Sequence, residues 1–354
     1  MKTIFLLAGE ASGDLYAGLV ARAIRELDGS VRMLGIGGRE MRGAGVERVQ
    51  DTSGLGVFGF WEGLTARGRM LAFAARVEAV LQEVRPDVFV PVSFSGVNLG
   101  LARFARDLGI KVVYLSPPQL WAWGKWRAKK LRAATDKVIC LLPFEEPLFR
   151  RLGVNAVFLG NPLVDLLEPR SLAPLSSGSL RLLLLPGSRR AEIQRHLPLM
   201  LGVAERLQQD IPGLKAFDLR LSDSGREPSA VSRERYERMA SADLVLAASG
   251  TVTLEAALLG VPMVVVYRLS PLSYLAAKMM VRLKYFSLPN LLLDRQVVPE
   301  FSQPTVEQVY RAARDLLMSP DRREKMIGEL SKIRPLFGEP GAALRIAREI
   351  LALT

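Results

Sequence analysis

Three short glycine-containing segments carry polar side chains of the kinds that bind phosphate groups. They are Ala-Gly-Glu-Ala-Ser-Gly-Asp at residues 8–14, Pro-Gly-Ser-Arg-Arg at 186–190 and Ser-Gly-Thr-Val-Thr-Leu-Glu at 249–255. Each follows a short apolar run and precedes a helical pattern, so backbone amides and a helix N-terminus are available to an anion. The first segment lacks the Gly-x-Gly-x-x-Gly spacing of dinucleotide-binding enzymes, which argues against an oxidoreductase.

The segment at 186–190 has the residue types of a phosphate site. Gly187 and Ser188 offer backbone N–H donors at the start of the next helix. Arg189 adds a permanent positive charge, and its guanidinium can donate two parallel hydrogen bonds to one phosphate. We therefore expect these three residues to bind the phosphates of a nucleotide.

The segment at 249–255 predicts a second contact with the same ligand. Ser249, Gly250 and Thr251 form its turn, and a pyrophosphate on the last two amides would leave Glu255 able to accept both hydroxyls of a ribose. The alternative for Glu255 is a favourable interaction of its charge with the helix dipole. Asn290 brings a side-chain amide to a nearby loop, where Asn is also an ordinary turn residue.

The first segment combines a carboxylate with small residues that let a ligand approach the backbone. Ser12 or Asp14 could simply cap the following helix. Glu10 has no evident capping role, so it is the stronger candidate for chemistry. Two phosphate-binding turns in the second half and this turn in the first predict a nucleotide-sugar cleft between two domains.

Apolar runs alternate with helical patterns along the chain. We expect buried strands at residues 4–7, 88–92, 112–115, 138–142, 156–159, 182–185, 217–221, 244–247 and 263–267, and helices at residues 15–27, 71–84, 306–318, 321–333 and 341–353. Continuous apolar strands between helices are typical of parallel sheets covered on both faces. The fold class predicted is α/β, with two Rossmann-like parallel-sheet domains.

The domain boundaries follow from the same pattern and from one Pro- and Ser-rich stretch. The predicted parts are a first Rossmann-like domain at 1–165, a linker at 166–179, a second Rossmann-like domain at 180–320, and C-terminal helices at 321–354. We expect the last part to pack on the N-terminal domain or on a partner subunit.

Composition limits the classes of function. The 354 residues include 48 Lys and Arg against 36 Asp and Glu, a formal net charge of +12, with one Cys and one His. A single Cys and a single His argue against a disulfide framework, a cysteine-based zinc site and a His-rich metal centre. The apolar runs are shorter than a membrane span, and the N-terminus lacks the pattern of a secretory signal. We therefore expect a soluble cytoplasmic chain with a negatively charged partner.

Two segments could meet a membrane. Residues 101–150 carry ten basic and four acidic side chains, and the basic run there follows Trp121 and Trp123, which fits nucleic acid, anionic lipid or a solvated helix face. Residues 57–73 are either a core helix with a loop or an interfacial helix that binds the anionic bilayer surface. The glycines within 57–73 favour the interfacial helix, whose candidate membrane-facing residues are Phe58, Phe60, Trp61, Leu64, Arg67, Met70 and Leu71.

At these residues the sequence resembles the bacterial lipid-A-disaccharide synthase family of two-Rossmann-domain (GT-B) glycosyltransferases. The resemblance is carried by the segments 8–14, 35–38, 116–123, 142–145, 185–189, 248–251, 254–255 and 287–291, in that order. It implies inverting transfer of 2,3-diacylglucosamine from its UDP donor to 2,3-diacylglucosamine 1-phosphate, giving the β-1,6-linked lipid A disaccharide precursor and UDP. It also implies that Arg189, Thr251, Glu255 and Asn290 bind UDP.

The resemblance also implies the partners of the chain. They are the UDP-activated acyl-glucosamine, a phosphorylated glycolipid acceptor, an anionic membrane surface and, in a homodimer, a second copy, with no metal or other cofactor and no nucleic acid. The protein would be peripheral on the inner face of the plasma membrane. Glu10 would lie in the catalytic cleft, and we place Gly9, Ser12 and Gly13 on the acceptor side.

One loop departs from the family pattern. Where the family has Asp-Ala-Pro-Asp-Phe-Asn, this sequence has Ser93-Phe94-Ser95-Gly96-Val97-Asn98. An inverting transfer needs a base near the attacking hydroxyl, and Ser93 and Asn98 do not supply one. Glu10 or Asp14 could take that role, or the acceptor could be another lipid. A third reading is a catalytically weak chain or a non-catalytic UDP-sugar binder.

Overall fold

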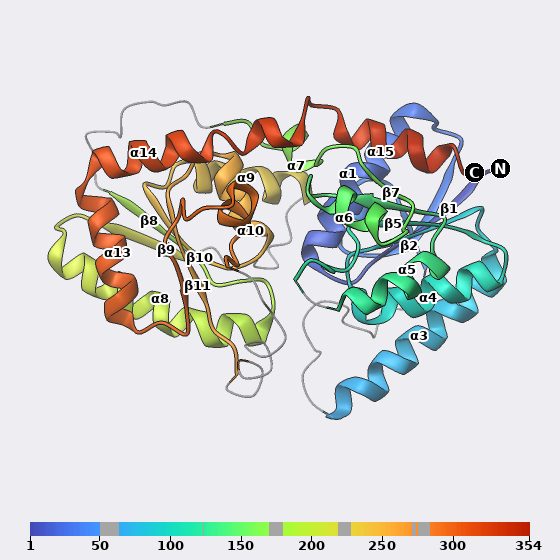
Figure 1. Cartoon of the computed structure of the whole chain (residues 1–354), viewed down its shortest axis with the longest axis horizontal. Helices are drawn as coiled ribbons and strands as arrows, with labels where there is room; N and C mark the ends of the chain where they lie inside the picture. Colours follow the sequence, from blue (N-terminus) through green and yellow to red (C-terminus); the bar gives the residue numbers. More distant parts are fainter. Residues whose placement is uncertain (50–63, 123, 170–179, 219–227, 271–273, 275–283) are drawn as a thin grey trace. The chain divides into compact units, whose positions relative to one another are not determined.

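The computed structural model describes two compact units (Figure 1). The described residues are 1–49, 64–122, 124–169, 180–218, 228–270, 274 and 284–354. The first unit consists of Met1–Asp165 and Glu339–Thr354, and the second consists of Leu166–Gly338. Of the linker expected at 166–179, residues 170–179 lie outside the described residues.

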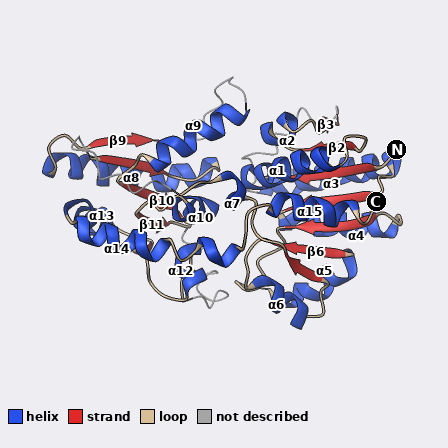
Figure 2. Ribbon diagram, turned by 90° about the horizontal axis from the view of Figure 1, so that it is seen from above, coloured by secondary structure: helices blue, strands red, loops and turns tan. Residues whose placement is uncertain are grey.

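The first unit contains one sheet in which every strand pair is parallel. In chain order the strands are β1 (Thr3–Ala8), β2 (Arg32–Ile36), β3 (Glu47–Arg48), β4 (Val88–Val92), β5 (Lys111–Leu115), β6 (Lys137–Cys140) and β7 (Ala156–Phe158). They lie side by side in the order β3-β2-β1-β4-β5-β6-β7 (Figure 2). The apolar runs predicted as strands therefore form a parallel sheet, as expected.

Helices cover both faces of this sheet. They are α1 (Ala11–Leu27), α2 (Arg39–Gly43), α3 (Leu64–Val84), α4 (Ser95–Asp107), the 3-10 turn η2 (Lys125–Arg127), α5 (Ala128–Ala134), α6 (Glu145–Arg151), α7 (Leu163–Leu166) and α15 (Ala342–Leu351). Alternate strand residues such as Phe5, Phe89 and Tyr114 share one core with Phe73 of α3 and Leu101 of α4. This core explains why the strands read as unbroken apolar runs.

The chain's last helix, α15, belongs to the first unit. It packs on α1, and its Ile346 and Ile350 are fully buried. Asp165 accepts hydrogen bonds at the start of α15 from the amides of Gly341 (2.6 Å) and Ala343 (2.9 Å). Lys137 of β6 forms an ion pair with Glu349. The predicted C-terminal segment is thus divided, because residues 321–338 cluster with the second unit and 339–354 with the first.

The second unit contains a five-stranded parallel sheet. Its strands are β8 (Arg181–Leu185), β9 (Lys215–Asp218), β10 (Leu244–Ala248), β11 (Met263–Tyr267) and β12 (Glu300–Ser302), in the order β12-β11-β10-β8-β9. Its helices are α8 (Arg190–Asp210), α9 (Pro228–Ala240), α10 (Thr251–Leu258), α12 (Leu288–Leu293), α13 (Val306–Met318), α14 (Pro320–Leu330) and the 3-10 turn η3 (Arg334–Phe337). Both expected Rossmann-like sheets are therefore present.

Several predicted boundaries differ from the structure; for example, the helices expected to begin at residues 15 and 71 begin at Ala11 and Leu64. The strand expected at 217–221 is β9, which begins at Lys215, and the residues after Asp218 lie outside the described part until 228. The helix expected at 321–333 ends at Leu330, because Pro335 cannot continue a helix and the chain enters η3. Among the described helices, none is both long and apolar enough to cross a bilayer.

The packing of α15 predicts that this helix stabilises the first unit. Ile346→Ala removes buried aliphatic volume and should lower the free energy of unfolding by about 3 kcal/mol. Arg348→Ala, an exposed change on the same helix, should leave it within about 0.5 kcal/mol. Denaturant titration of the full chain measures both. Equal stability of the two variants would contradict the packing role of α15.

Candidate functional site

The carboxyl ends of β1, β4 and β5 bring polar and strained residues to one edge of the first sheet. Glu10 follows β1, Ser93 and Phe94 follow β4, and Ser116 follows β5. Ser93, Phe94 and Ser116 have φ angles of 52°, 43° and 56°, in the left-handed region that non-glycine residues rarely adopt. Ligands of parallel α/β sheets bind beyond this edge, and backbone strain gathers at such sites.

The glycine turn and the loop after β4 lie in contact. A Cβ atom on Gly9 would come within 2.6 Å of the Phe94 ring, closer than real carbon atoms approach. Only glycine at position 9 lets Phe94 occupy this position over the turn. The loop Ser93–Asn98, which departs from the family sequence, is therefore built into the same edge as Glu10.

Two buried side chains hold the strained backbone of Ser93. The Tyr114 hydroxyl donates to the Ser93 carbonyl oxygen at 2.8 Å, and the Asn98 amide donates to the same oxygen at 3.0 Å and to that of Val92 at 3.3 Å. Burial raises the pKa of the Tyr114 hydroxyl, so it remains a donor. Asn98 is thus a positioning residue for the loop rather than a base.

Arg127 is a buried cation near this loop. Its side chain lies against Gly124, its charge acts on the Tyr114 hydroxyl, and burial lowers the pKa of its guanidinium. Arg127 belongs to the basic run that follows Trp121 and Trp123 in the sequence. Its burial beside the sheet edge makes it a candidate contact for a phosphate group.

Asp14 does not cap the helix in which it lies. Its carboxylate accepts hydrogen bonds from the amides of Gly38 (2.7 Å), Glu40 (3.0 Å) and Met41 (3.2 Å), at the start of α2. Burial raises the pKa of this carboxyl group, although the three amide donors act in the opposite direction. Both oxygens are engaged with backbone, so Asp14 fixes α2 and is poorly placed to accept a substrate proton.

Glu10 is the other predicted base, and its setting differs. It stands at the N-cap position of α1 without a side-chain capping hydrogen bond, and it is half-buried. Its charge acts on the Tyr114 hydroxyl, which places it in the same polar cluster. Gly13 is buried against β4, and Ser12 is half-buried in the first turn of α1.

Trp121 is tied to the first unit rather than fully exposed to a membrane. Its indole N–H donates to the Glu145 carboxylate at 3.0 Å, and its ring meets Phe144 edge to face at 5.4 Å between centroids. Glu145 also accepts from the amides of Leu141 (3.2 Å) and Leu142 (3.1 Å), and burial raises its pKa to about 7. The acceptor- or membrane-facing role of Trp121 stays a prediction, and its half-buried ring is held by these contacts.

The other predicted membrane residues divide into several groups. Those outside the described residues are Phe58, Phe60, Trp61 and Trp123; Leu64 and Arg67 are described only as backbone of α3. Met70 is half-buried beside Gly96 of α4, and Leu71 is 71% exposed. A further exposed aromatic ring is Trp126, at 66%, with the Lys130 ammonium 5.4 Å above it.

In the second unit, the turn at 186–189 follows β8 and opens α8. Gly187 has a φ of 112°, and a Cβ there would meet the Glu192 carboxylate at 2.8 Å. Arg189 occupies the N-cap position of α8, and its exposed guanidinium contacts Glu192 at 3.0 Å. Ser188 is exposed between them. Ser188 and the Arg189 side chain are thus exposed at this turn, and the binding of phosphate there stays a prediction.

The turn at 249–251 follows the neighbouring strand β10 and opens α10. The Ser249 hydroxyl donates to the carbonyl oxygen of Phe286 at 2.9 Å, which joins this turn to the segment before α12. Gly250 is exposed at the N-cap position, and Thr251 begins the helix. Because β8 and β10 pair in parallel, the two predicted phosphate turns lie at the same sheet edge.

Glu255 is buried and paired with an arginine that the sequence analysis missed. The Arg235 guanidinium of α9 lies 2.6 Å from its carboxylate, and both side chains are largely buried. Arg235 and Glu255 lie in different helices that are separated by β10, so no short sequence motif links the two residues. This ion pair holds the Glu255 carboxylate beside the turn at 249–251, and Arg235 balances its negative charge.

Asn290 makes internal hydrogen bonds with both ends of its amide. Its oxygen accepts from the amides of Val297 (2.7 Å) and Val298 (2.9 Å), and its nitrogen donates to the Val298 carbonyl (2.9 Å) and to Glu300 (3.0 Å). Glu300 also accepts from the amides of Phe286 and Ser287. This geometry assigns the Asn290 side chain to loop shape, and it leaves no donor for UDP.

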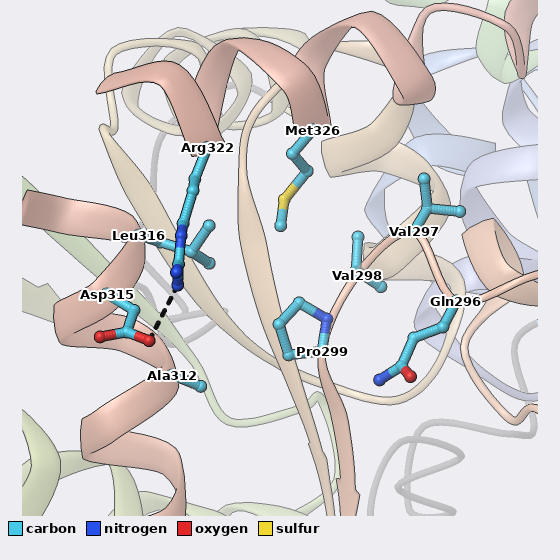
Figure 3. A pocket seen from close by; sticks show the side chains of 9 residues that line it. All are labelled: Gln296, Val297, Val298, Pro299, Ala312, Asp315, Leu316, Arg322 and Met326. Carbon is cyan, nitrogen blue, oxygen red and sulfur yellow. Dashed lines mark hydrogen bonds and ion pairs between the residues drawn. The ribbon is translucent and has the colours of Figure 1, made fainter. Parts of the chain in front are cut away.

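A cavity of about 310 Å³ lies beside the segment that Asn290 holds (Figure 3). Apolar side chains dominate it, with an ion pair between Asp315 and Arg322 at one side. None of the residues predicted to act in binding or catalysis lines it. Within the described part of the chain, no cluster of three or more His, Cys, Asp or Glu side chains could hold a metal ion.

Comparison with known proteins shows which family the chain is similar to. Residues 4–334 match the family model described as Lipid-A-disaccharide synthetase. The lipid-A-disaccharide synthase of Syntrophus aciditrophicus (strain SB) is 35% identical over 375 residues, covering 100% of this chain and 97% of the relative. That of Trichlorobacter lovleyi is 36% identical over 374 residues, covering 99% and 97%.

Solved structures agree on the fold. The S. aureus MnaA–UDP co-structure has a TM-score of 0.67 at 13% identity, covering 100% of this chain and 98% of that one. The UDP-GlcNAc 2-epimerase from Neisseria meningitidis bound to UDP-GlcNAc has a TM-score of 0.64 at 12% identity, covering 99% and 100%. At these identities the likeness shows the fold of two parallel-sheet domains alone.

The raised pKa of Glu145 predicts a pH-dependent stability. The folded chain binds this proton with a pKa of about 7 against an ordinary value of 4.5, so it holds more protons than the unfolded chain between these pH values. Stability contributed by Glu145 is therefore lost as pH rises through that window, by about 3 kcal/mol in total. Glu145→Gln should remove this slope in denaturant titrations across pH. Parallel pH profiles of the variant and the unaltered chain would refute the assignment.

Proposed function

The chain belongs to the lipid-A-disaccharide synthase family, and from this premise we propose how its own residues bind donor and acceptor. The reaction moves 2,3-diacylglucosamine from its UDP-activated form to 2,3-diacylglucosamine 1-phosphate and releases UDP. The observation that carries it is the match over residues 4–334, together with about 35% identity to curated lipid-A-disaccharide synthases over the full chain.

The second unit binds the UDP part of the donor. The amides of Gly187 and Ser188 and the guanidinium of Arg189 are exposed at the edge where phosphates approach, and the Gly250–Thr251 turn lies at the same edge. In this proposal the phosphate oxygens replace Glu192 as the partner of Arg189. The charge of the leaving UDP is then balanced by Arg189 and the turn amides, with no metal or other cofactor.

Glu255 accepts the ribose hydroxyls, and Arg235 holds it in place. A carboxylate has two oxygens with several acceptor positions, so one ion pair leaves capacity for hydroxyl donors. Asn290, which the family resemblance implied as a UDP contact, acts instead through the loop 286–298 that its side chain organises.

The first unit supplies the base. Asp14 is occupied by three backbone amides, and Ser93 and Asn98 lack a carboxylate. Glu10 therefore takes the proton from the 6-hydroxyl of the acceptor as that oxygen bonds to the anomeric carbon of the donor. The bond from this carbon to the UDP oxygen breaks with its electron pair, which leaves the β-linked disaccharide and UDP. Arg127 provides a positive charge for the acceptor phosphate.

The substrates carry acyl chains, so we place the reaction at an anionic membrane surface. Leu71 of α3 and Trp126 of η2 expose apolar side chains, and the exposed Lys129 and Lys130 lie next to Trp126 in the chain. Apolar insertion combined with cations near lipid phosphates is the usual basis of peripheral binding. The proposal includes peripheral attachment to the inner face of the plasma membrane and a homodimer.

The loop after β4 favours one second candidate, a GT-B transferase with a different lipid acceptor. Its positions 93–96 contain no acid, and Tyr114 and Asn98 fix its backbone in a strained form. Under this alternative the chain binds UDP and turns over UDP-diacylglucosamine, and it makes no disaccharide with 2,3-diacylglucosamine 1-phosphate. A non-catalytic UDP-sugar binder would bind UDP and release none.

The donor site predicts a specific loss on removing Arg189. UDP should raise the midpoint of thermal unfolding of the full chain, because a ligand that binds only the folded state stabilises it. Arg189→Ala should weaken UDP binding by about 10- to 100-fold, the range for a hydrogen bond to a charged group. Arg311→Ala, which removes an exposed arginine from a pair within α13, serves as the matched control. Unchanged UDP affinity in Arg189→Ala would remove the donor site from this turn.

The base assignment predicts that Glu10→Gln abolishes transfer and preserves UDP binding. The amide cannot accept the proton, so the transfer rate should fall by at least about 100-fold. Glu26→Gln, an exposed change at the other end of α1, should transfer at the normal rate. Disaccharide and UDP are measured with both substrates present. Transfer at the normal rate by Glu10→Gln would show that the base lies elsewhere.

A further inference from the structure

The chain's single histidine is buried inside the second unit. His196 lies in the second turn of α8 and is 1% exposed. Burial removes water from the imidazole ring, so its two nitrogens need hydrogen-bond partners within the protein.

Both ring nitrogens of His196 have a backbone partner. Nδ1 lies 3.0 Å from the carbonyl oxygen of Pro186, and Nε2 accepts a hydrogen bond from the amide of Arg268 at 2.9 Å. A carbonyl oxygen only accepts and an amide N–H only donates. The contacts therefore require the neutral tautomer with its hydrogen on Nδ1.

These two partners belong to loops at the proposed donor site. Pro186 opens the turn whose next residues are Gly187 and Ser188, and Arg268 directly follows β11. The His196 ring also stacks on Tyr267, with centroids 6.4 Å apart and planes inclined by 25°.

The stacking extends to the second phosphate turn. Tyr267 packs against Phe286 at 5.9 Å between centroids, and the Phe286 carbonyl accepts the hydroxyl of Ser249. The His196 ring is thus part of a series of contacts that joins the carboxyl ends of β8, β11 and β10.

We propose that His196 is a positioning residue for the UDP donor, acting as a neutral bridge that fixes the Pro186–Ser188 turn against the loop after β11. The inference rests on the proposed function, because the turn matters only if UDP binds there. His196 touches no substrate in this account. By holding the carbonyl oxygen of Pro186, His196 orients the backbone amides of Gly187 and Ser188.

The charges around His196 agree with a neutral ring. Burial lowers its pKa, and the groups that act on its charge are Glu192 and Arg195 from its own helix and Arg268 from the loop after β11. Tyr267, which stacks on it, is a neutral phenol whose pKa burial raises. Protonation would place a second N–H against the Arg268 amide and break the bridge, so the bridge is lost as pH falls.

Two variants of the full chain test the bridge. His196→Phe keeps an aromatic ring and removes both hydrogen bonds. His196→Gln introduces a side-chain carbonyl oxygen that can accept a hydrogen bond from the backbone amide of Arg268. Met200→Ala, a fully buried change one turn further along α8, controls for general destabilisation of the helix. Each is measured for thermal midpoint, UDP affinity, and KM and kcat with both substrates.

The proposed bridge predicts that loss of His196 affects binding of the UDP donor and leaves binding of the acceptor unchanged. His196→Phe should weaken UDP binding and raise the donor KM by about tenfold, the worth of one to two hydrogen bonds, with the acceptor KM unchanged. His196→Gln should recover part of this affinity. As pH falls below the ordinary histidine pKa of about 6.5, UDP affinity of the unaltered chain should fall more steeply than that of His196→Phe.

Three results would overturn the inference while the proposed function stands. They are normal UDP affinity in His196→Phe, an equal loss in Met200→Ala, and parallel pH profiles of UDP affinity. Absence of UDP binding by the unaltered chain would instead overturn the proposed function, and the bridge with it.

Discussion

Parallel strand pairing is the constraint on which the rest of this structure depends. In a parallel sheet every strand ends at the same edge, so the turns after β1, β4 and β5 meet in the first unit, and those after β8, β10 and β11 meet in the second. The turns after β1, β4, β8 and β10 each open a helix whose first amides have no partner within the helix. Glu10 stands at such a position in the first unit, and the parallel pairing of β8 with β10 brings Arg189 and Gly250 to one edge of the second sheet.

Much of the buried polar chemistry serves to hold these turns. Asp14, Asn290 and His196 each accept hydrogen bonds from backbone amides of another segment, and Glu145 accepts from two amides just before it and from the Trp121 indole. A buried polar group must be paired, and pairing to a distant amide fixes the distance between two loops. The residues left at the rim, Glu10, Ser188 and Arg189, are the ones that can meet a ligand.

The sequence predicts the architecture well and the site in part. Unbroken apolar runs between helices can only be parallel strands covered on both faces, so the two sheets follow from pattern alone. The turns at 187–189 and 249–251 are equally visible, since glycine and small polar residues open a helix there. Arg235, Tyr114 and Glu300 were missed, because what matters in them is a contact between residues far apart in the chain. Asp14 was predicted as a helix cap or a base, and Asn290 as a UDP contact, for the same reason. Residue type shows what a side chain can bind, and only the fold shows what it already binds.

The central claim is that this chain transfers diacylglucosamine from UDP to a diacylglucosamine phosphate, with no acidic residue at positions 93–96 of the loop after β4. The most direct measurement is disaccharide formation by the purified full chain from UDP-2,3-diacylglucosamine and 2,3-diacylglucosamine 1-phosphate, followed together with UDP release. The account predicts one disaccharide for each UDP, and UDP release that depends on the acceptor. UDP release without disaccharide, or no release at all, would contradict it.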